Sequence, residues 1–458
     1  MAKNKKKTVA KKATREAKKA AKKNPKLFIA IVAFILVIAI VVGACWYFFI
    51  YKKQDPAENP ANPDNTHQSD SNGDSQNGGT QGDGTQNGDT QGGTQNGDTQ
   101  GGTQGGGTQG GGTEASDLSI HFLELGVANA GDCVLIKSGD TEVLIDAGAK
   151  SNTAPTKAMR DYVAQYCTDG TLEYVIATHA HEDHIAGLVG DKNNSARPGF
   201  LYQYKIGTII QFARTGSSSN IYKNYQTAVE YCREQGTNVY TALECTQETN
   251  GASATYYLDE AQTISMTILY QKYYEQKAST ENDYSVCMLL TQKTAEKEYN
   301  ALFTGDLEES GERSLVENNP NLPHCDLFKG GHHGSSTSSN EVLLDKITPD
   351  NIAICTCAGT FEYAKKPSAG GSILNTFPTQ EAINRMAKHT KNIYVTTLGI
   401  ISSADYSTTG FKSMNGNIVF YYDKDEKTMK LRCSNNTTIL KDTEWFKANR
   451  TWPDYGVQ

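Results

Sequence analysis

Short apolar runs separated by glycine and asparagine turns begin near residue 117 and continue almost to the C-terminus. Runs of four to eight such residues predict strands, and longer amphipathic stretches predict helices. Gly139-Asp140 between two apolar runs predicts a tight hairpin. The predicted strands cover residues 121–125, 133–137, 141–146, 173–178, 264–271, 284–292, 300–304, 327–329, 351–355, 417–422 and 428–432. The predicted helices cover residues 154–167, 219–235, 307–317, 339–346 and 379–389.

The order of these elements indicates the fold class. Strands and helices alternate irregularly, and hairpins lie near both ends of the region. Such an order favours two mixed sheets covered by helices, which is a layered α/β sandwich. We therefore expect one domain over residues 117–458.

A different pattern precedes residue 117. Residues 27–51 are an uninterrupted apolar stretch, long enough to cross a bilayer as a helix, with Trp46, Tyr47 and Tyr51 at one end. Residues 1–26 are rich in lysine and predict a basic cytoplasmic tail. The expectation is a single-pass membrane anchor with an extracellular C-terminal domain. In the alternative, Val42-Gly43-Ala44-Cys45 is a lipoprotein processing box, and Cys45 is lipidated after cleavage.

Residues 52–116 form a low-complexity stretch of glycine, glutamine, threonine and asparagine that has no aromatic residue. Such a composition cannot bury enough apolar surface to offset the entropy of ordering, so we predict a disordered linker. The formal net charge of the chain is -7, although its first 26 residues are strongly basic. The remainder is therefore acidic and gives no electrostatic indication of nucleic-acid binding.

One short stretch contains most of the candidate chemistry. Thr178-His179-Ala180-His181-Glu182-Asp183-His184 follows the predicted strand 173–178, so it lies where a strand ends and a loop begins. Side chains two positions apart project to the same side of an extended segment. Neutral imidazole and carboxylate groups are ligands that suit zinc, manganese or iron. This cluster predicts a metal site.

Two later loops add to it. The strand 300–304 ends in Gly305-Asp306, and the carboxylate of Asp306 is placed to bridge two cations or to cap the following helix. The strand 327–329 leads into Gly330-Gly331-His332-His333-Gly334. Ser335 and Ser336 follow, before a predicted helix with a capping-box spacing at Ser338 and Glu341. Hydroxyls and free amides there suit an anionic group such as phosphate, or simply cap the helix.

Taken together, these islands resemble the metallo-β-lactamase superfamily. The region 117–435 is most similar to the extracellular hydrolase domain of ComEC-type competence proteins. The resemblance implies an αββα four-layer sandwich. It is carried by six stretches in the family's order: Gly126–Ile136, Leu144–Gly148, His179–Leu188, Asn282–Ser285, Leu302–Asp306 and Gly331–Ser339.

The resemblance also implies roles for individual residues and a pair of divalent ions, Zn²⁺ or Mn²⁺. His179 and His181 would hold one ion, the second would be held by Asp183, His184 and His333, and Asp306 would bridge them. Asp146 and Asp132 would orient the ligand residues without binding an ion themselves. No histidine lies between His184 and His324, where many members supply one, so the first ion's site is expected to be incomplete.

Two such ions make water reactive near neutral pH and polarise a phosphoryl or carbonyl oxygen. Asp183 could take a proton, and His332 could protonate the leaving group. The function expected is that of an extracellular phosphodiesterase or nuclease. Two alternatives remain open. One is an esterase acting on choline- or teichoic-acid-type phosphodiesters or lactones, with tyrosines 256–257 and 270–274 forming a cage for a quaternary amine. The other is a non-catalytic surface binding module.

Overall fold

The structure is a computed structural model that describes residues 117–149, 154–191, 194, 197–358, 376–401 and 408–458. The predicted basic tail, membrane anchor and linker lie outside the described residues. Within the described part of the chain, no helix is long and apolar enough to cross a membrane. The described residues form two eight-stranded mixed sheets, which confirms the layered α/β sandwich.

The first sheet has the strand order β16-β15-β1-β2-β3-β4-β5-β6. Strands β16 to β3 pair antiparallel, and β3 to β6 pair parallel. The turn between β2 and β3 is the predicted two-residue hairpin Gly139-Asp140. The bounds are β1 (Ser119–Phe122), β2 (Val134–Ser138), β3 (Thr141–Ile145), β4 (Thr171–Ala177), β5 (Lys205–Gln211), β6 (Asn238–Thr241), β15 (Ile418–Asp423) and β16 (Thr428–Cys433).

The second sheet has the order β14-β13-β12-β11-β10-β9-β8-β7. Its central strands β10 to β13 run parallel, with antiparallel strands on both sides. The bounds are β7 (Thr255–Tyr257), β8 (Ile264–Leu269), β9 (Cys287–Lys293), β10 (Glu298–Phe303), β11 (Leu327–Lys329), β12 (Asn351–Ala358), β13 (Ile393–Ile401) and β14 (Thr408–Ser413).

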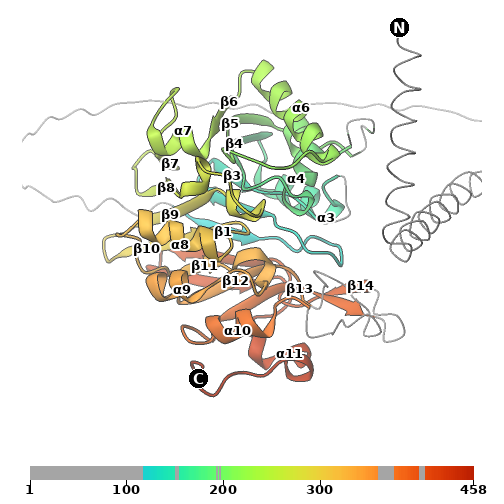
Figure 1. The fold of residues 1–458 in the computed structure, drawn as a ribbon, viewed down its shortest axis with the longest axis vertical. Helices are drawn as coiled ribbons and strands as arrows, with labels where there is room; N and C mark the ends of the chain where they lie inside the picture. The colour runs from blue at the N-terminus through green and yellow to red at the C-terminus, as the bar shows by residue number, and fades with distance from the viewer. Residues whose placement is uncertain (1–116, 150–153, 192–193, 195–196, 359–375, 402–407) are drawn as a thin grey trace, which may run out of the picture. The chain divides into compact units, whose positions relative to one another are not determined.

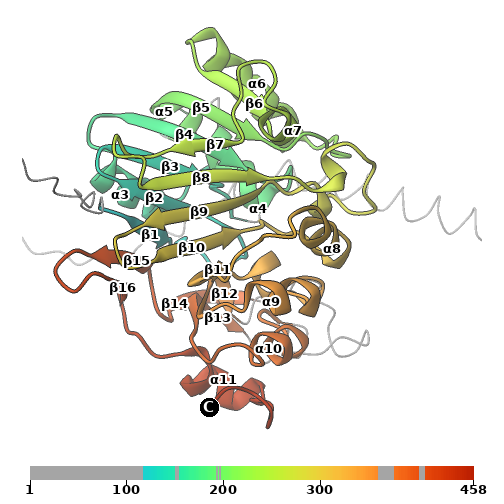
Figure 2. The same ribbon diagram turned by 90° about the vertical axis from the view of Figure 1, so that its left-hand side faces the viewer.

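Helices cover the two sheets, as Figures 1 and 2 show. Helices α3 to α7 lie in the half of the domain that holds β3 to β8, and α8 to α11 lie in the half that holds β10 to β14. The α-helices are α3 (Lys157–Tyr166), α4 (Glu182–Val189), α5 (Phe200–Gln203), α6 (Asn220–Glu234), α7 (Ala242–Gln247), α8 (Glu309–Asn318), α9 (Glu341–Ile347), α10 (Gln380–Met386) and α11 (Glu444–Asn449). Short 3₁₀ helices are η1 (Lys272–Tyr274), η2 (Asn282–Tyr284), η3 (Gly331–Gly334) and η6 (Leu440–Asp442).

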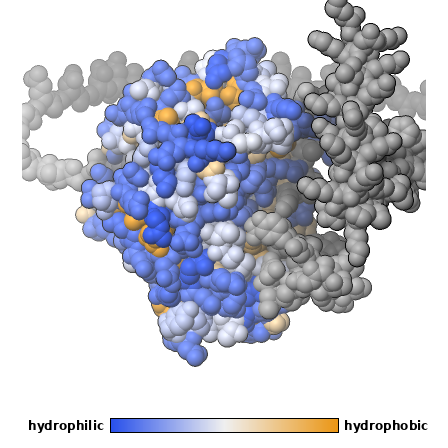
Figure 3. Space-filling view, viewed as in Figure 1, coloured by the Kyte–Doolittle hydropathy of each residue, from blue (hydrophilic) through white to orange (hydrophobic). Residues whose placement is uncertain are grey.

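Two apolar clusters form the core. The larger lies between the sheets and under α3, α4 and α6; the smaller joins the second sheet to α8, α9 and α10. Val163 of α3 and Leu344 of α9 are fully buried in them. Burying such a side chain contributes about 1.5–3 kcal/mol. The face shown in Figure 3 is mostly hydrophilic, with small separate apolar spots.

The structure differs from the sequence prediction at one point that matters for the site. The chain after β4 does not remain a loop, because α4 begins at Glu182 with His181 as its N-cap. Asp183 and His184 therefore lie in the first helical turn, where an acidic side chain is favoured by the helix dipole. This helical turn fixes the direction of both side chains relative to His179.

Candidate metal centre

Six chain segments meet at one edge of the sandwich. Parallel strands β3, β4, β10 and β11 end there, and the antiparallel strands β2 and β9 begin there. The residues that follow or precede these strand ends are the predicted site residues. They are Asp132, Asp146, His179, His181, Asp183, His184, Asp306, His332 and His333.

Backbone contacts hold these segments against one another. The amide of Asp132 donates to the carbonyl of Asp183 at 3.0 Å, and the amide of Ala147 donates to the carbonyl of His184 at 2.8 Å. Gly148 is required by this close approach, since a Cβ atom there would lie 2.2 Å from the carbonyl carbon of Asp183. The edge is therefore a rigid backbone framework.

The two histidines that precede α4 face each other. His179 Nε2 lies 3.0 Å from His181 Nδ1. The other ring nitrogen of His179 lies 3.1 Å from Thr178 Oγ1 and 3.4 Å from Ser285 Oγ. His179 is fully buried, whereas His181 is partly exposed. Two ring nitrogens at this separation can share one cation.

Asp146 orients His184 from the side of the ring that faces away from Asp306. Its carboxylate accepts from the Thr178 amide at 2.8 Å and the Thr178 hydroxyl at 2.7 Å, and lies 2.8 Å from His184 Nδ1. His184 Nε2 is thereby directed at Asp306 Oδ2, 3.0 Å away. Asp146 adopts a φ of +54°, an unfavourable conformation for a side-chain-bearing residue that often marks functional sites. This placement agrees with the supporting role predicted for Asp146.

Asp306 lies at the centre of the cluster. Its Oδ2 is 3.5 Å from His333 Nε2, 3.7 Å from His332 Nε2 and 4.0 Å from His179 Nε2. Its Oδ1 is buried and accepts no hydrogen bond. A buried carboxylate oxygen without a partner is costly unless a cation is present.

His332 and His333 both adopt left-handed backbone conformations, with φ values of 45° and 55°. His333 Nδ1 lies 3.2 Å from the Cys355 carbonyl and 3.3 Å from Asp132 Oδ1, which leaves Nε2 facing Asp306 and Asp183. That Nε2 is buried and makes no hydrogen bond. His332 instead has Nδ1 3.0 Å from Thr337 Oγ1, so its Nε2 also turns toward the centre.

These donors fit a pair of divalent ions. His179, His184 and Asp306 form one group of converging ligand atoms, and Asp183, His184 and His333 form another. Each ring except that of His181 has its second nitrogen held by a hydroxyl, carboxylate or carbonyl group, as is usual for metal-ligating histidines. His181 belongs to neither group, although its Nδ1 lies 3.0 Å from His179 Nε2.

Burial and the neighbouring carboxylates shift the pKa values of the ligand rings in opposite directions. Burial lowers the pKa of His179 and of His181. Burial also disfavours the charged form of His184, but Asp306 and Asp146 outweigh it and hold the pKa of His184 well above its ordinary value. Burial would lower the pKa of His333, but Asp306 and Asp132 outweigh it and raise this pKa to about 10. The pKa shifts thus favour the neutral form of His179 and His181 and the protonated form of His184 and His333.

Sequence reasoning missed one buried residue of the site, Lys329. It is the last residue of β11, and its ammonium lies 2.5 Å from Asp132 Oδ2. The signal was available, since a lysine in an apolar strand run directly before Gly-Gly-His-His is unusual. Ser285, within the quoted Asn282–Ser285 stretch, was also given no role, although its hydroxyl accepts from the Asp306 amide at 3.2 Å.

The predicted anion site is arranged differently. The amides of Ser339 and Asn340, which precede α9, already bind the buried carboxylate of Glu312 at 2.6 and 2.9 Å. The N-cap is Asn340, so the capping box expected from Ser338 and Glu341 is wrong. Ser335 is buried with its hydroxyl 3.2 Å from Thr337 Oγ1, and Ser336 is exposed. The amides of Ser339 and Asn340 are therefore not available to a substrate, because an internal carboxylate occupies them.

Two of the tyrosines considered for a quaternary-amine cage serve the packing of the fold. Tyr274 is buried, and its hydroxyl accepts from the Cys287 amide at 2.9 Å. Tyr256 packs edge-on against Tyr174 at 5.5 Å between ring centroids. Both rings are used in the packing of the fold.

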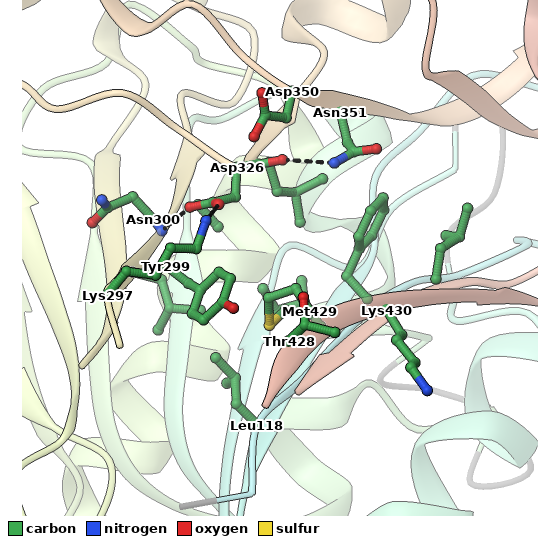
Figure 4. Close-up of a pocket in the computed structure, with 16 residues that line it drawn as sticks. Leu118, Lys297, Tyr299, Asn300, Asp326, Asp350, Asn351, Thr428, Met429 and Lys430 are labelled. Atoms are coloured by element: carbon green, nitrogen blue, oxygen red, sulfur yellow. Dashed lines mark hydrogen bonds and ion pairs between the residues drawn. The ribbon is translucent and has the colours of Figure 1, made fainter. Parts of the chain in front are cut away.

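A cavity of about 230 Å³ lies at the opposite end of β10 and β11, between the two sheets (Figure 4). Figure 4 shows Lys297 and Asn351 turned toward Asp326. Lys297 pairs with Asp326 at 2.6 Å, and the Asn300 amide donates to the same carboxylate at 2.8 Å. Asp350 pairs with His324 at 3.2 Å. The cavity is smaller than most ligand pockets, and these carboxylates already have partners.

Comparison with known proteins agrees with this geometry. Residues 126–194 match the model of the metallo-beta-lactamase superfamily. The chain is similar to competence protein ComA of Neisseria gonorrhoeae, with 35% identity over 88 residues, which is 19% of this chain and 11% of that protein. The chain thus spans about a tenth of the curated relative's length.

Two solved structures are also similar. The metallo-beta-lactamase fold protein YhfI from Bacillus subtilis is 10% identical with a TM-score of 0.33, covering 60% of this chain and 95% of that one. The subclass B3 metallo-beta-lactamase MEM-A1 from a soil metagenome library is 13% identical with a TM-score of 0.27, covering 46% and 76%.

Proposed function

The described residues contain a metallo-beta-lactamase fold domain, and we propose that it is a metal-dependent hydrolase that cleaves phosphodiesters outside the cell. The observation that supports this best is the set of ligand atoms around Asp306. Four imidazole rings direct nitrogens to within 4.0 Å of Asp306 Oδ2, while Asp306 Oδ1 and His333 Nε2 are buried without hydrogen-bond partners. Bound divalent ions would satisfy both atoms and would make water reactive near neutral pH.

The protein's own residues would divide the remaining tasks. His179, His181, Asp183, His184, Asp306 and His333 would hold two ions, Zn²⁺ or Mn²⁺, with Asp306 between them. Thr337 holds the Nδ1 of His332, and its Nε2 lies 3.7 Å from Asp306 Oδ2, beside the proposed ligands. It is placed to give a proton to the leaving oxygen. Asp183 is partly exposed and could take the proton from the attacking water.

Phosphodiesters are preferred over the alternatives for two reasons. Similarity to a competence protein makes a nucleic-acid substrate the first class to test. The choline-ester alternative loses its main support, because Tyr256 and Tyr274 serve the packing of the fold. A lactone or other surface ester remains the second candidate, since the same ligand set would polarise a carbonyl oxygen. A purely binding module does not explain why the ligand atoms converge.

The test uses the full chain in detergent with Mn²⁺ or Zn²⁺. Single- and double-stranded DNA, RNA, bis(p-nitrophenyl) phosphate and a lactone are compared as substrates. The expected result is metal-dependent cleavage of a phosphodiester, abolished by chelation and by His181→Ala. Lactone cleavage alone would favour the second candidate, and a wild-type chain that binds metal without any hydrolysis would favour the binding module.

We also propose that residues 27–51 anchor the protein in the cell membrane, with the domain outside. The support is the apolar stretch preceded by the lysine-rich residues 1–26. The protein should fractionate with membranes, and protease added to intact spheroplasts should release the domain. Mass spectrometry of the mature N-terminus distinguishes an intact anchor from a chain that begins at lipidated Cys45. Protection of the domain in intact spheroplasts would contradict the orientation.

A further inference from the structure

Lys329 is the one buried lysine in the described part of the chain. A lysine is almost never fully buried unless its charge is compensated, because an isolated ammonium loses its hydration there. Its Nζ lies 2.5 Å from Asp132 Oδ2 and 3.3 Å from the carbonyl oxygens of Gly305 and Gly330. The ammonium thus forms one ion pair and two hydrogen bonds.

Each of these three acceptors belongs to a different part of the site. Gly305 directly precedes Asp306, and Gly330 begins the loop that carries His332 and His333. Asp132 follows the Gly126–Gly131 turn, and its other carboxylate oxygen, Oδ1, lies 3.3 Å from His333 Nδ1. Asp132 Oδ2 also lies 3.7 Å from His184 Nδ1. One ammonium therefore links three loops that come from separate strands.

A buried ion pair is weak support for a role in stability, since an apolar pair of similar volume often serves as well. Asp132 Oδ1 lies 3.3 Å from His333 Nδ1, the ring nitrogen that also lies 3.2 Å from the Cys355 carbonyl. Both oxygens favour a proton on Nδ1, so that Nε2 stays available on the side of Asp306. The pair of Lys329 and Asp132 thus helps to fix the orientation of a ligand ring.

We infer that Lys329 is a positioning residue that, through Asp132, orients His333 and joins the Asp306 and His332–His333 loops into one metal-binding unit. This inference rests on the proposed metal site and adds a residue to which the sequence analysis gave no role. Lys329 touches neither the expected substrate nor an ion. Its effect should therefore appear in metal affinity and in the geometry of a bound ion.

The test compares two charge-neutral double variants of the full chain. Lys329→Met/Asp132→Asn removes the buried pair at the metal edge. Lys297→Met/Asp326→Asn removes the 2.6 Å pair at the opposite ends of the same strands β10 and β11 and is the matched control. Metal affinity is measured by competition with a chelator, the absorption spectrum of bound Co²⁺ reports coordination geometry, and circular dichroism reports folding.

Loss of the buried pair should weaken metal binding by about 10–100-fold, the usual effect of removing an outer partner of a metal ligand, and should change the Co²⁺ spectrum. The control should keep wild-type affinity and spectrum. Equal affinity and an unchanged spectrum in Lys329→Met/Asp132→Asn would overturn the inference, and so would an equal loss in the control.

If the double variant does not fold, Lys329→Gln, which keeps an N–H donor near Asp132, is judged by the same two measurements. A wild-type chain that binds no ion would instead overturn the proposed function together with this inference. The two failures are thus distinguishable.

Discussion

Both ends of strands β10 and β11 carry charged side chains, but the two ends differ in whether these groups have partners. At the start of these strands, Lys297 and Asp326 pair beside a cavity of about 230 Å³. At their ends, Asp306 Oδ1 and His333 Nε2 are buried without hydrogen-bond partners, although several ring nitrogens surround them. The charged groups beside the cavity are paired, whereas the ligand cluster contains buried polar atoms without hydrogen-bond partners. Unsatisfied buried donors and acceptors therefore indicate the reactive end better than empty volume does.

The largest effect that separates the two ends should come from Asp306→Asn. Removing this central carboxylate should weaken metal binding by more than about 100-fold, because outer partners alone account for about 10–100-fold. Asp326→Asn is the matched change at the other end and should leave metal affinity unchanged while lowering the free energy of unfolding by about 1–3 kcal/mol. Inductively coupled plasma analysis and denaturant unfolding measure the two quantities. Equal metal loss in both variants would contradict the comparison.

His332→Gln should separate catalysis from metal binding. The variant should retain its metal, and kcat should fall by about 10²–10⁴-fold, the usual contribution of a positioned acid or base. The fall should be smaller for p-nitrophenolate leaving groups, which depart without a proton, than for alkoxide leaving groups. An equal fall for both leaving groups, or loss of the metal, would remove the proposed role of His332.

Gly148→Ala tests the tight backbone framework of the metal edge. A Cβ atom at Gly148 would meet the backbone of Asp183 and His184 at 2.2–2.3 Å, so the variant should lose about 4 kcal/mol or more of unfolding free energy, the range of exceptional single substitutions. Gly170→Ala is the control. Gly170 has a positive φ, unlike Gly148, but no atom lies within 4 Å of its added Cβ, and about 1 kcal/mol is expected. Similar losses in the two variants would show that the edge is not tightly packed.

The smallest expected effect is a pH dependence of the metal-free protein. The pKa of His333 is raised to about 10, so the stability that its proton contributes is complete below about pH 6.5 and is lost as the pH rises through about 10. In EDTA the Tm should therefore fall by a few degrees between pH 7 and 10, whereas His333→Asn should lack this component. A flat profile in the wild type would show that His333 does not carry the proton.

Much of the fold could be predicted from the sequence. The features that depend on long-range packing could not. Gly139-Asp140 and the apolar runs predicted the first hairpin correctly, because turn chemistry and alternation are local. The helix beginning at Glu182 was missed, since two acidic residues and a histidine before an apolar run also fit a loop. Lys329 could not be assigned from its neighbours alone. Its partner, Asp132, is almost two hundred positions away in the sequence, and only the pairing of sheets brings them together.

Metal analysis of the purified full chain, wild type beside Asp306→Asn, tests the central claim most directly. The account predicts one tightly bound divalent ion and a second, weaker one per wild-type chain, and no tightly bound ion in the variant. A wild-type chain without any bound ion, or a variant that keeps its ions, would contradict it.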